Sequence, residues 1–254
     1  MAWKIDLRKA YDTIDWSFLT SMLEHLKFPS KFIAWMEMCV QTTSYSIMIN
    51  EEMIDFFEGK RGLRQGDPLS PFLFTIAMEC LSRMLQRLNR TGGFYYHPKC
   101  HCFKLSHIMF TDDLLLFSSG RPSVVLAIKE VVSKFLNFSG LSINLQKSQL
   151  FTGGMNVGKV SWIEEVIGCK VAPLPVRYLG LPFTSKSLSR KDCESLIEKI
   201  TARLDCWSNR FLSRAERRVL VSSVLQAMIF FWARVCFLPK TVIQVVNAVT
   251  PQKF

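Results

Sequence analysis

The sequence lacks an apolar run at its N-terminus. Charged side chains occur at Lys4, Asp6, Arg8 and Lys9, where a secretory signal needs an apolar segment. We therefore expect an intracellular protein that is not secreted, although the sequence does not distinguish nucleus from cytoplasm. The eight cysteines have no spacing typical of a disulfide framework, which indicates free thiols in a reducing compartment.

Long uncharged hydrophobic runs are also missing. The most apolar segment, Val219 to Leu238, contains Gln226 and Arg234, whereas a membrane span needs about 20 mostly apolar, nearly uncharged residues. This segment predicts a buried helix and no membrane partner. The sequence has no internal repeat and no low-complexity stretch.

Neither a zinc pattern nor a Walker-type phosphate loop is present. Two histidines and two cysteines fall between His97 and Cys102, but their spacing fits no common zinc site and no second ligand pair follows. The stretch from Gly59 to Pro71 is glycine-rich and basic, yet it lacks Gly-Lys-Ser/Thr. It leads into a predicted helix, so it either presents backbone N–H groups to an anion or only makes turns.

What is present indicates a globular protein that meets a polyanion. The chain has 254 residues, of which 49% are hydrophobic and 21% charged, enough for a sizeable core and one or two domains. Its formal net charge is +11, and nucleic acid is the usual partner of so basic a protein. One basic group could border a nucleic-acid backbone or could simply be a solvated face; it comprises Arg203, Arg210, Arg214, Arg217 and Arg218.

Two adjacent acids stand between two apolar runs. Leu105 to Phe110 and Leu114 to Phe117 predict short strands, and Thr111-Asp112-Asp113 between them predicts a tight hairpin turn. Two neighbouring carboxylates repel each other, and a hard divalent cation with oxygen ligands would relieve that repulsion. Taken alone, the pair could equally be an ordinary acidic turn.

A third acid lies near the start of the chain. Trp3 to Leu7 alternates apolar and polar residues, which predicts a half-buried strand with Lys4 and Asp6 on one face. If this strand neighbours the acidic hairpin in one antiparallel sheet, three carboxylates converge. Such a set can hold two Mg²⁺ ions about 3.5–4 Å apart, the arrangement that serves phosphoryl transfer.

With these motifs in order, the chain resembles the reverse transcriptase region of non-LTR (LINE-type) retrotransposons, particularly those of plants. The resemblance covers nearly the whole chain, and five motifs carry it in the same order and spacing. They are Lys4 to Asp12 (KIDLRKAYD), Gly62 to Pro71 (GLRQGDPLSP), Phe110 to Asp113 (FTDD), Gly140 to Asn144 (GLSIN) with Lys147, and Tyr178 to Gly180 (YLG).

The resemblance implies an α+β fold: a polymerase palm, with an antiparallel sheet and helices on one face, followed by a mainly helical partial thumb. Residues 1–185 would form the palm with part of the connection to the fingers, and residues 186–254 the partial thumb. The implied activity is RNA-directed DNA polymerisation. The implied partners are an RNA template, a DNA primer and deoxynucleoside triphosphates, while the oligomeric state is not indicated.

The resemblance also assigns roles to particular residues. Asp6, Asp112 and Asp113 would be the catalytic acids that bind two Mg²⁺ ions, with Mn²⁺ as an alternative. Tyr11 would exclude a 2′-hydroxyl by occupying its space. The remaining assignments are Gln65 and Gly66 along the incoming nucleotide and template, Lys147 at the nucleotide phosphates, and Tyr178, Leu179 and Gly180 at the primer end.

Departures from the family pattern keep a second interpretation open. Thr111 stands where members usually have Ala, and the basic fingers expected before Asp6 are absent, so we expect a truncated chain. The endonuclease is absent too, and an RNase H domain would lie beyond Phe254. The alternative is therefore a catalytically inactive remnant that at most binds nucleic acid.

Two other enzyme classes fit the motifs less well. An RNA-dependent RNA polymerase is disfavoured by Tyr11, because an enzyme that uses ribonucleotides should leave room for the 2′-hydroxyl. A metal-dependent hydrolase could use three acids, but it would need neither the loop around Gln65 nor the ribbon at Tyr178.

Overall fold

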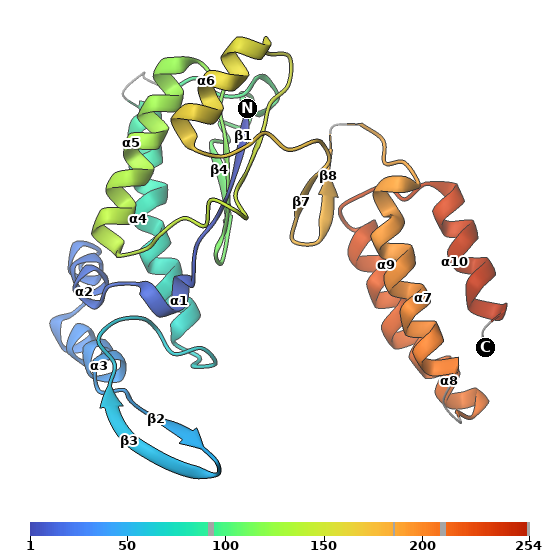
Figure 1. The fold of residues 1–254 in the computed structure, drawn as a ribbon, viewed down its shortest axis with the longest axis horizontal. Helices are drawn as coiled ribbons and strands as arrows, with labels where there is room; N and C mark the ends of the chain where they lie inside the picture. Colours follow the sequence, from blue (N-terminus) through green and yellow to red (C-terminus); the bar gives the residue numbers. More distant parts are fainter. Residues whose placement is uncertain (91–93, 185, 209–211, 253–254) are drawn as a thin grey trace. The chain divides into compact units, whose positions relative to one another are not determined.

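The computed structural model describes residues 1–90, 94–184, 186–208 and 212–252. The chain forms two compact units, Met1–Ala172 and Pro173–Phe254 (Figure 1). The sequence predicted a division after residue 185. The observed division falls earlier because the hairpin at Tyr178 forms a two-stranded sheet of its own and Leu181 joins the core of the second unit. The naming of these parts as palm and thumb stays a prediction.

The first unit is built around a four-stranded antiparallel sheet. Its strands are β1 (Ala2–Asp6), β4 (His107–Phe110), β5 (Asp113–Phe117) and β6 (Gln149–Phe151), in the order β4-β5-β1-β6. The strand from the start of the chain therefore lies between two strands that come far later in the sequence. Alternation of apolar and polar residues along β1 gives this strand one buried and one polar face.

Helices cover one face of this sheet. Trp3 and Ile5 of β1 lie opposite Leu116 and Leu114 of β5, and all four side chains are buried in one core. Helices α4 (Ser70–Arg90) and α5 (Pro122–Ser139) pack their apolar stripes onto this core. Figure 1 shows both helices beside the sheet. The α+β class with helices on one face is confirmed. The other face of β1 carries Lys4 and Asp6.

Four further helices complete the described part of the first unit: α1 (Ala10–Thr13), α2 (Trp16–His25), α3 (Ser30–Gln41) and α6 (Val157–Ile167). The spacing of Phe18, Leu19, Met22, Leu23 and Leu26 in the sequence predicts one apolar stripe, and in α2 the first four of these residues are buried. The sequence of α3 predicts inward positions for Phe32, Trp35, Met36, Cys39 and Val40, and this prediction is partly wrong. The buried residue of the helix is Ile33, whereas Trp35 and Cys39 are exposed.

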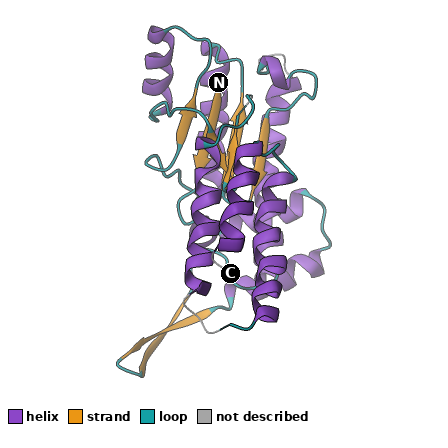
Figure 2. Ribbon diagram, turned by 90° about the vertical axis from the view of Figure 1, so that its right-hand side faces the viewer, coloured by secondary structure: helices purple, strands orange, loops and turns teal. Residues whose placement is uncertain are grey.

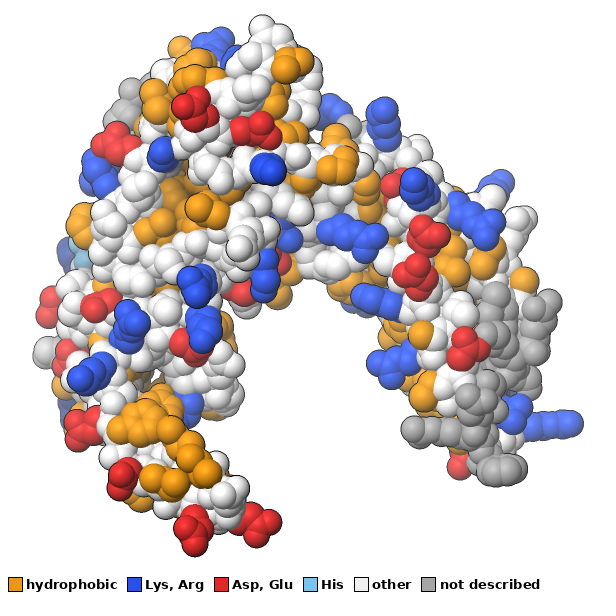
Figure 3. Space-filling model, in the orientation of Figure 1, with side chains coloured by type: hydrophobic (Ala, Val, Ile, Leu, Met, Phe, Trp, Pro, Cys, Tyr) orange, Lys and Arg blue, Asp and Glu red, His pale blue; other side chains and the backbone are white. Residues whose placement is uncertain are grey.

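The sequence predicts a hairpin of residues 44–50 and 53–57 around Glu51 and Glu52, and strands β2 (Ser44–Ile49) and β3 (Glu52–Glu58) form it. Figure 2 shows this hairpin apart from the four-stranded sheet. Apolar side chains are exposed along it, among them Met48 and Phe56 (Figure 3). Cross-strand packing within the pair, such as Tyr45 on Phe57, supports the hairpin locally.

The second unit is mainly helical after a short hairpin of β7 (Val176–Tyr178) and β8 (Leu181–Phe183). The spacing of Leu196, Ile197, Ile200 and Leu204, followed by Trp207, predicts a helical apolar face. This face is confirmed, and it packs with Leu225 and Trp232. The elements are α7 (Glu194–Ser208), α8 (Arg214–Leu220), a π-helical turn (Val221–Leu225), α9 (Gln226–Ala233) and α10 (Lys240–Gln252). Short 3₁₀ turns occur at Pro98–Cys100 and Lys191–Cys193.

The apolar segment from Val219 to Leu238 runs through several of these elements. It is only partly buried, because Trp232 is inside the core while Phe230 and Phe237 are exposed. Among the described residues, no helix is both long and apolar enough to cross a membrane. Of the arginines predicted to form a basic surface, Arg203, Arg214 and Arg218 are exposed and Arg217 partly so, while Arg210 lies outside the described residues.

A glycine-containing loop is docked on the chain that leaves β1. The backbone N–H of Gly62 donates to the Ile14 carbonyl (2.8 Å), and that of Leu63 donates to the Tyr11 carbonyl (2.6 Å). The Trp16 indole N–H donates to the Gly62 carbonyl (2.6 Å). Gly62 has a φ of 90°, and a Cβ there would lie 2.6 Å from the Asp12 carbonyl oxygen. Glycine is thus required for this close approach.

This docking predicts unequal effects of alanine at two glycines. Gly66 has a similar φ of 91°, but no atom lies within 4 Å of the position that a Cβ would occupy there. Gly66→Ala should therefore lower the free energy of unfolding by backbone strain alone, about 1–2 kcal/mol. Gly62→Ala should lower it by about 1–3 kcal/mol more, because its methyl group collides with backbone. Denaturant unfolding followed by circular dichroism measures both; equal losses would contradict the docking.

Candidate active site

The pairing of β1 with β5 brings the distant acids together. Asp6, the last residue of β1, is the cross-strand partner of Asp113, the first residue of β5. Asp113 also pairs with Phe110 of β4, which leaves Thr111 and Asp112 as a two-residue turn. The prediction that the N-terminal strand neighbours the acidic hairpin is confirmed. All three carboxylates therefore belong to one end of the sheet.

The turn that carries Asp112 has a constrained backbone. Thr111 has a φ of 50°, in the left-handed region that β-branched residues rarely adopt. Its hydroxyl donates to the Asp112 carboxylate (2.9 Å). A turn with positive φ matches the twist of the flanking strands, and here it leaves the side chain of Asp112 exposed beyond the sheet.

Besides pairing with Asp113, the backbone of Asp6 is held by the segment that follows α5. The Asp6 carbonyl accepts from the Asn144 N–H (2.9 Å), and the Arg8 N–H donates to the Ser142 carbonyl (2.8 Å). The Asp6 N–H donates to the hydroxyl of Ser148 (3.1 Å), which is buried. Sequence reasoning missed Ser148. A small polar residue directly before an apolar strand gave no signal beyond its position beside Lys147.

The charges at this site partly compensate one another. Burial raises the pKa of the Asp6 carboxyl; the charge of Lys147 opposes this, the charges of Asp112 and Asp113 raise it further, and Lys4 lowers it. The Lys4 ammonium lies 3.6 Å from a carboxylate oxygen of Asp113. Lys147 is thus close enough to act on Asp6. Lys4 is an additional site residue, which the sequence placed on the same face but did not assign.

The side chains do not themselves enclose a cation. Within the part of the chain that the structure describes, no three His, Cys, Asp or Glu side chains are grouped to hold a metal ion. Asp113 contacts Lys4, and Asp112 accepts from Thr111, so each of these carboxylates has a partner of its own. The donor set nevertheless fits Mg²⁺, because it consists of carboxylate oxygens at one partly exposed end of the sheet.

Tyr11, Gln65 and Gly66 lie on the chain segments that border these acids. The Tyr11 ring stacks on Phe74 of α4, with centroids 5.0 Å apart. Burial and the charge of Asp112 raise the pKa of its phenol. The Gln65 amide donates to the Asp12 carboxylate (3.2 Å), so the docked loop is also tied by a side chain. Open space surrounds Gly66.

The remaining predicted site residues belong to the second unit. Leu179 and Gly180 form the two-residue turn between β7 and β8, with φ values of 51° and 79°. Tyr178 is buried and meets the Phe183 ring edge-to-face, with centroids 6.5 Å apart. The predicted ribbon is therefore present as a hairpin. Its assignment to the primer end stays a prediction.

Comparison with known proteins identifies the chain's relatives. The family model described as "Reverse transcriptase (RNA-dependent DNA polymerase)" matches residues 1–183. A Pol polyprotein of the type-1 retrotransposable element R2 from Popillia japonica is 25% identical over 195 residues, covering 73% of this chain and 31% of that protein. An uncharacterized 149 kDa protein of transposon TX1 from Xenopus laevis is 24% identical over 239 residues, covering 89% and 17%. The chain thus spans about a third or less of these relatives.

The fold has counterparts among solved structures. Telomerase from Candida albicans, solved with a fragment of telomeric RNA, superposes with a TM-score of 0.51 at 13% identity, covering 99% of this chain and 44% of that one. Telomerase from Candida tropicalis gives a TM-score of 0.52 at 14% identity, covering 99% and 37%. These likenesses support the palm-like fold. Because the family model covers far more than half of the chain, the protein belongs to the reverse transcriptase (RNA-dependent DNA polymerase) family, as a domain related to the Pol proteins of non-LTR retrotransposons.

Proposed function

We propose that this chain performs RNA-directed DNA synthesis, transferring nucleotides from deoxynucleoside triphosphates to a primer 3′ end. The observation that carries the proposal is the register of β1 and β5, in which Asp6 lies opposite Asp113 with Asp112 beside it. Converging carboxylates, here at one end of the two central strands of the sheet, are the donor set that nucleotidyl transfer uses. The proposed partners are an RNA template and a DNA primer, consistent with the chain's net charge of +11.

Reverse transcriptases use divalent metal ions, and here Asp6, Asp112 and Asp113 would hold two Mg²⁺ or Mn²⁺ ions. When bound, such ions activate the attacking oxygen and neutralise the leaving group. In the reaction the primer 3′ oxygen bonds to the α-phosphorus, the bond to the β-phosphate bridge breaks, and pyrophosphate leaves. Lys147, which acts on Asp6 by its charge, is proposed to meet the negative phosphates.

Lys4 is proposed to position Asp113. Its ammonium contacts that carboxylate at 3.6 Å, and both side chains are largely covered, with 19% and 25% of their surfaces exposed. The pair would keep Asp113 on the acid face of the sheet while Asp112, exposed in the turn, stays free to turn toward a cation. Lys4 also stabilises the charged form of Asp6.

Tyr11 is proposed to select deoxynucleotides. Stacking on Phe74 fixes its ring, and the docked loop contacts its carbonyl, so the ring cannot easily move aside for an additional oxygen. Gln65 and Gly66 would border the nucleotide and template, since the space around Gly66 admits a ligand at close range. Tyr178, Leu179 and Gly180 are proposed to contact the primer end.

Asp112→Asn tests the proposed role of the acids. The change removes one charge and should lower primer extension at least about 100-fold. The assay uses the 254-residue chain, an RNA template, a DNA primer, deoxynucleotides and Mg²⁺. Asp55→Asn is the matched control, because Asp55 is an exposed acid of β3 with a positive φ that Asn tolerates. A folded wild-type chain that makes no product would favour the inactive remnant, and equal rates in both variants would refute the metal assignment.

Substitutions at Tyr11 test the steric gate. Tyr11→Ala should reduce discrimination against ribonucleotides by about 10- to 200-fold, the range for one steric contact in a binding pocket. Tyr11→Phe keeps the ring and should retain the wild-type preference. Competition between a deoxynucleotide and its ribonucleotide in single-nucleotide extension measures the ratio. Unchanged selectivity in Tyr11→Ala would reject the gate.

Lys4→Gln tests positioning through the pH profile. The ammonium of Lys4 lowers the pKa of Asp6, so its removal should raise that pKa. Because Asp6 must be ionised to act, the acidic limb of the extension rate should move to higher pH, whereas Lys4→Arg should restore the wild-type limb. If Lys4→Gln lowered the extension rate equally at every pH and left the acidic limb in place, Lys4 would have a purely structural role.

A further inference from the structure

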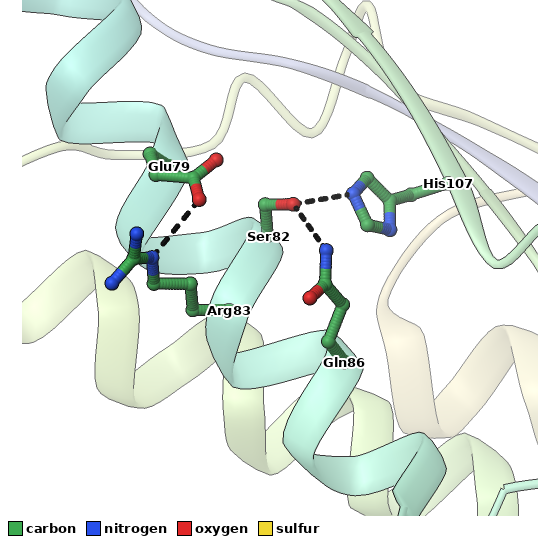
Figure 4. Close-up of polar contacts among 5 residues, drawn as sticks. All are labelled: Glu79, Ser82, Arg83, Gln86 and His107. Carbon is green, nitrogen blue, oxygen red and sulfur yellow. Dashed lines mark hydrogen bonds and ion pairs between the residues drawn. The ribbon is translucent and has the colours of Figure 1, made fainter.

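The C-terminal half of α4 is bordered by two grooves that lie away from the acids. One lies between α4 and residues 96–107, and the other between α4 and α2; both are lined by Gln86 and Arg90. This half of the helix lies on the helix-covered side of the sheet, since Ser82 of α4 bonds to His107 of β4 (Figure 4). Arg83 is about 20 Å further along the helix than Ser70, which adjoins the docked loop.

Three arginines form a stripe on this part of α4. Arg83, Arg87 and Arg90 recur at intervals of four and three residues, the spacing of one helix face, and all three are exposed. Glu79, the carboxylate that lines the groove beside α2, is already bonded to Arg83 at 2.9 Å (Figure 4). Lys104 lines the first groove from the opposite wall. The face is therefore strongly basic.

Aromatic side chains accompany these charges. Tyr96 and Phe103 line the first groove, and the Phe103 ring is 83% exposed. A ring so exposed in the groove of Arg90 and Lys104 provides a flat apolar surface beside cations. In the same groove the side-chain carbonyl oxygen of Asn89 is buried and has no hydrogen-bond partner among the described residues.

A neutral polar network supports the groove wall. The Ser82 hydroxyl lies 3.1 Å from His107 Nε2, and the Gln86 amide donates to that hydroxyl at 3.4 Å (Figure 4). The Ser106 hydroxyl lies 2.9 Å from His107 Nδ1. Burial lowers the pKa of His107, which keeps the ring neutral near pH 7. The network thus fixes the wall without adding charge, so the positive field comes from the arginines and Lys104.

We propose that this α4 basic face, made of Arg83, Arg87, Arg90, Phe103 and Lys104, binds single-stranded nucleic acid outside the polymerase site. Cations that follow a backbone, together with exposed rings for unpaired bases, are the combination such ligands require. The arginine stripe rises about 10 Å, which matches roughly three stacked nucleotides at about 3.4 Å each. An acidic protein would satisfy the arginines but would leave the exposed Phe103 ring without a use.

Binding of unprimed 12-nucleotide oligo(U) and oligo(dT), measured by fluorescence anisotropy at several salt concentrations, tests the proposal. Arg87→Ala/Arg90→Ala should weaken binding about tenfold at low salt and reduce the slope of log K against log salt by about 1.4, for two lost phosphate contacts. Phe103→Ala should weaken binding about tenfold without changing the slope. The two oligonucleotides show whether RNA or DNA is preferred.

Lys129→Ala/Lys134→Ala is the matched control, because it removes two exposed cations from α5 of the same unit. It should change affinity much less than the α4 variant. Ultraviolet cross-linking should attach oligo(U) to the segment containing Tyr96 and Phe103. Equal affinities of the two double variants, or cross-links found only elsewhere, would overturn the proposal. Primer extension by the α4 variant at saturating template should match wild type, so this result is independent of the polymerase assignment.

Discussion

The antiparallel register between β1 and β5 governs the geometry of the site. Direct pairing of Asp6 with Asp113 also pairs Ile5 with Leu114 and Trp3 with Leu116. The same register therefore buries the apolar face and presents the acids at one end. A slip of one residue would turn the apolar side chains outward and the carboxylates into the core. Burial of the core thus enforces the placement of the acids, although the acids contribute no packing themselves.

Two loops then fix the chain as it leaves β1. The docked loop bonds through Gly62 and Leu63 to the backbone around Tyr11, and the turn at Asn144 bonds to the carbonyl of Asp6. Both attachments use backbone groups, so they tolerate side-chain variation except where a Cβ would collide, as at Gly62. These backbone contacts hold the segment that carries Asp6 in place. Lys4 and Lys147 then offset part of the repulsion between the carboxylates.

The positive charge of the first unit extends beyond the acid face. Lys4 and Lys147 act on carboxylates of the site, whereas Arg90 of α4 shares its groove with the exposed Phe103 ring. A polymerase has to hold a template that extends past its catalytic centre. A second surface for a single strand on the same unit would raise the local concentration of that strand without competing for the site.

Local patterns in the sequence were enough to predict the elements, the family and the acids. Alternation along Trp3 to Leu7 predicted β1, the Thr-Asp-Asp step predicted the hairpin, and five ordered motifs identified a reverse transcriptase. Each of these signals lies within a short segment, so it can be read without knowing what the segment packs against. Exposure along α3 was predicted less well, because whether Trp35 is covered depends on neighbours that periodicity does not specify.

The sequence led us to expect that the three acids converge, but the particular contacts between groups far apart in the chain emerged only from the folded molecule. Asp6 pairs with Asp113, Lys4 contacts Asp113, Ser148 bonds to Asp6, and Asn89 and Phe103 share a groove with Arg90. The boundary between the two units, at Ala172 and Pro173, likewise follows from packing and not from a local sequence pattern. Each depends on strand register or helix packing between distant segments. No local pattern encodes such distances, because the same short segment can fit many partners until the core selects one.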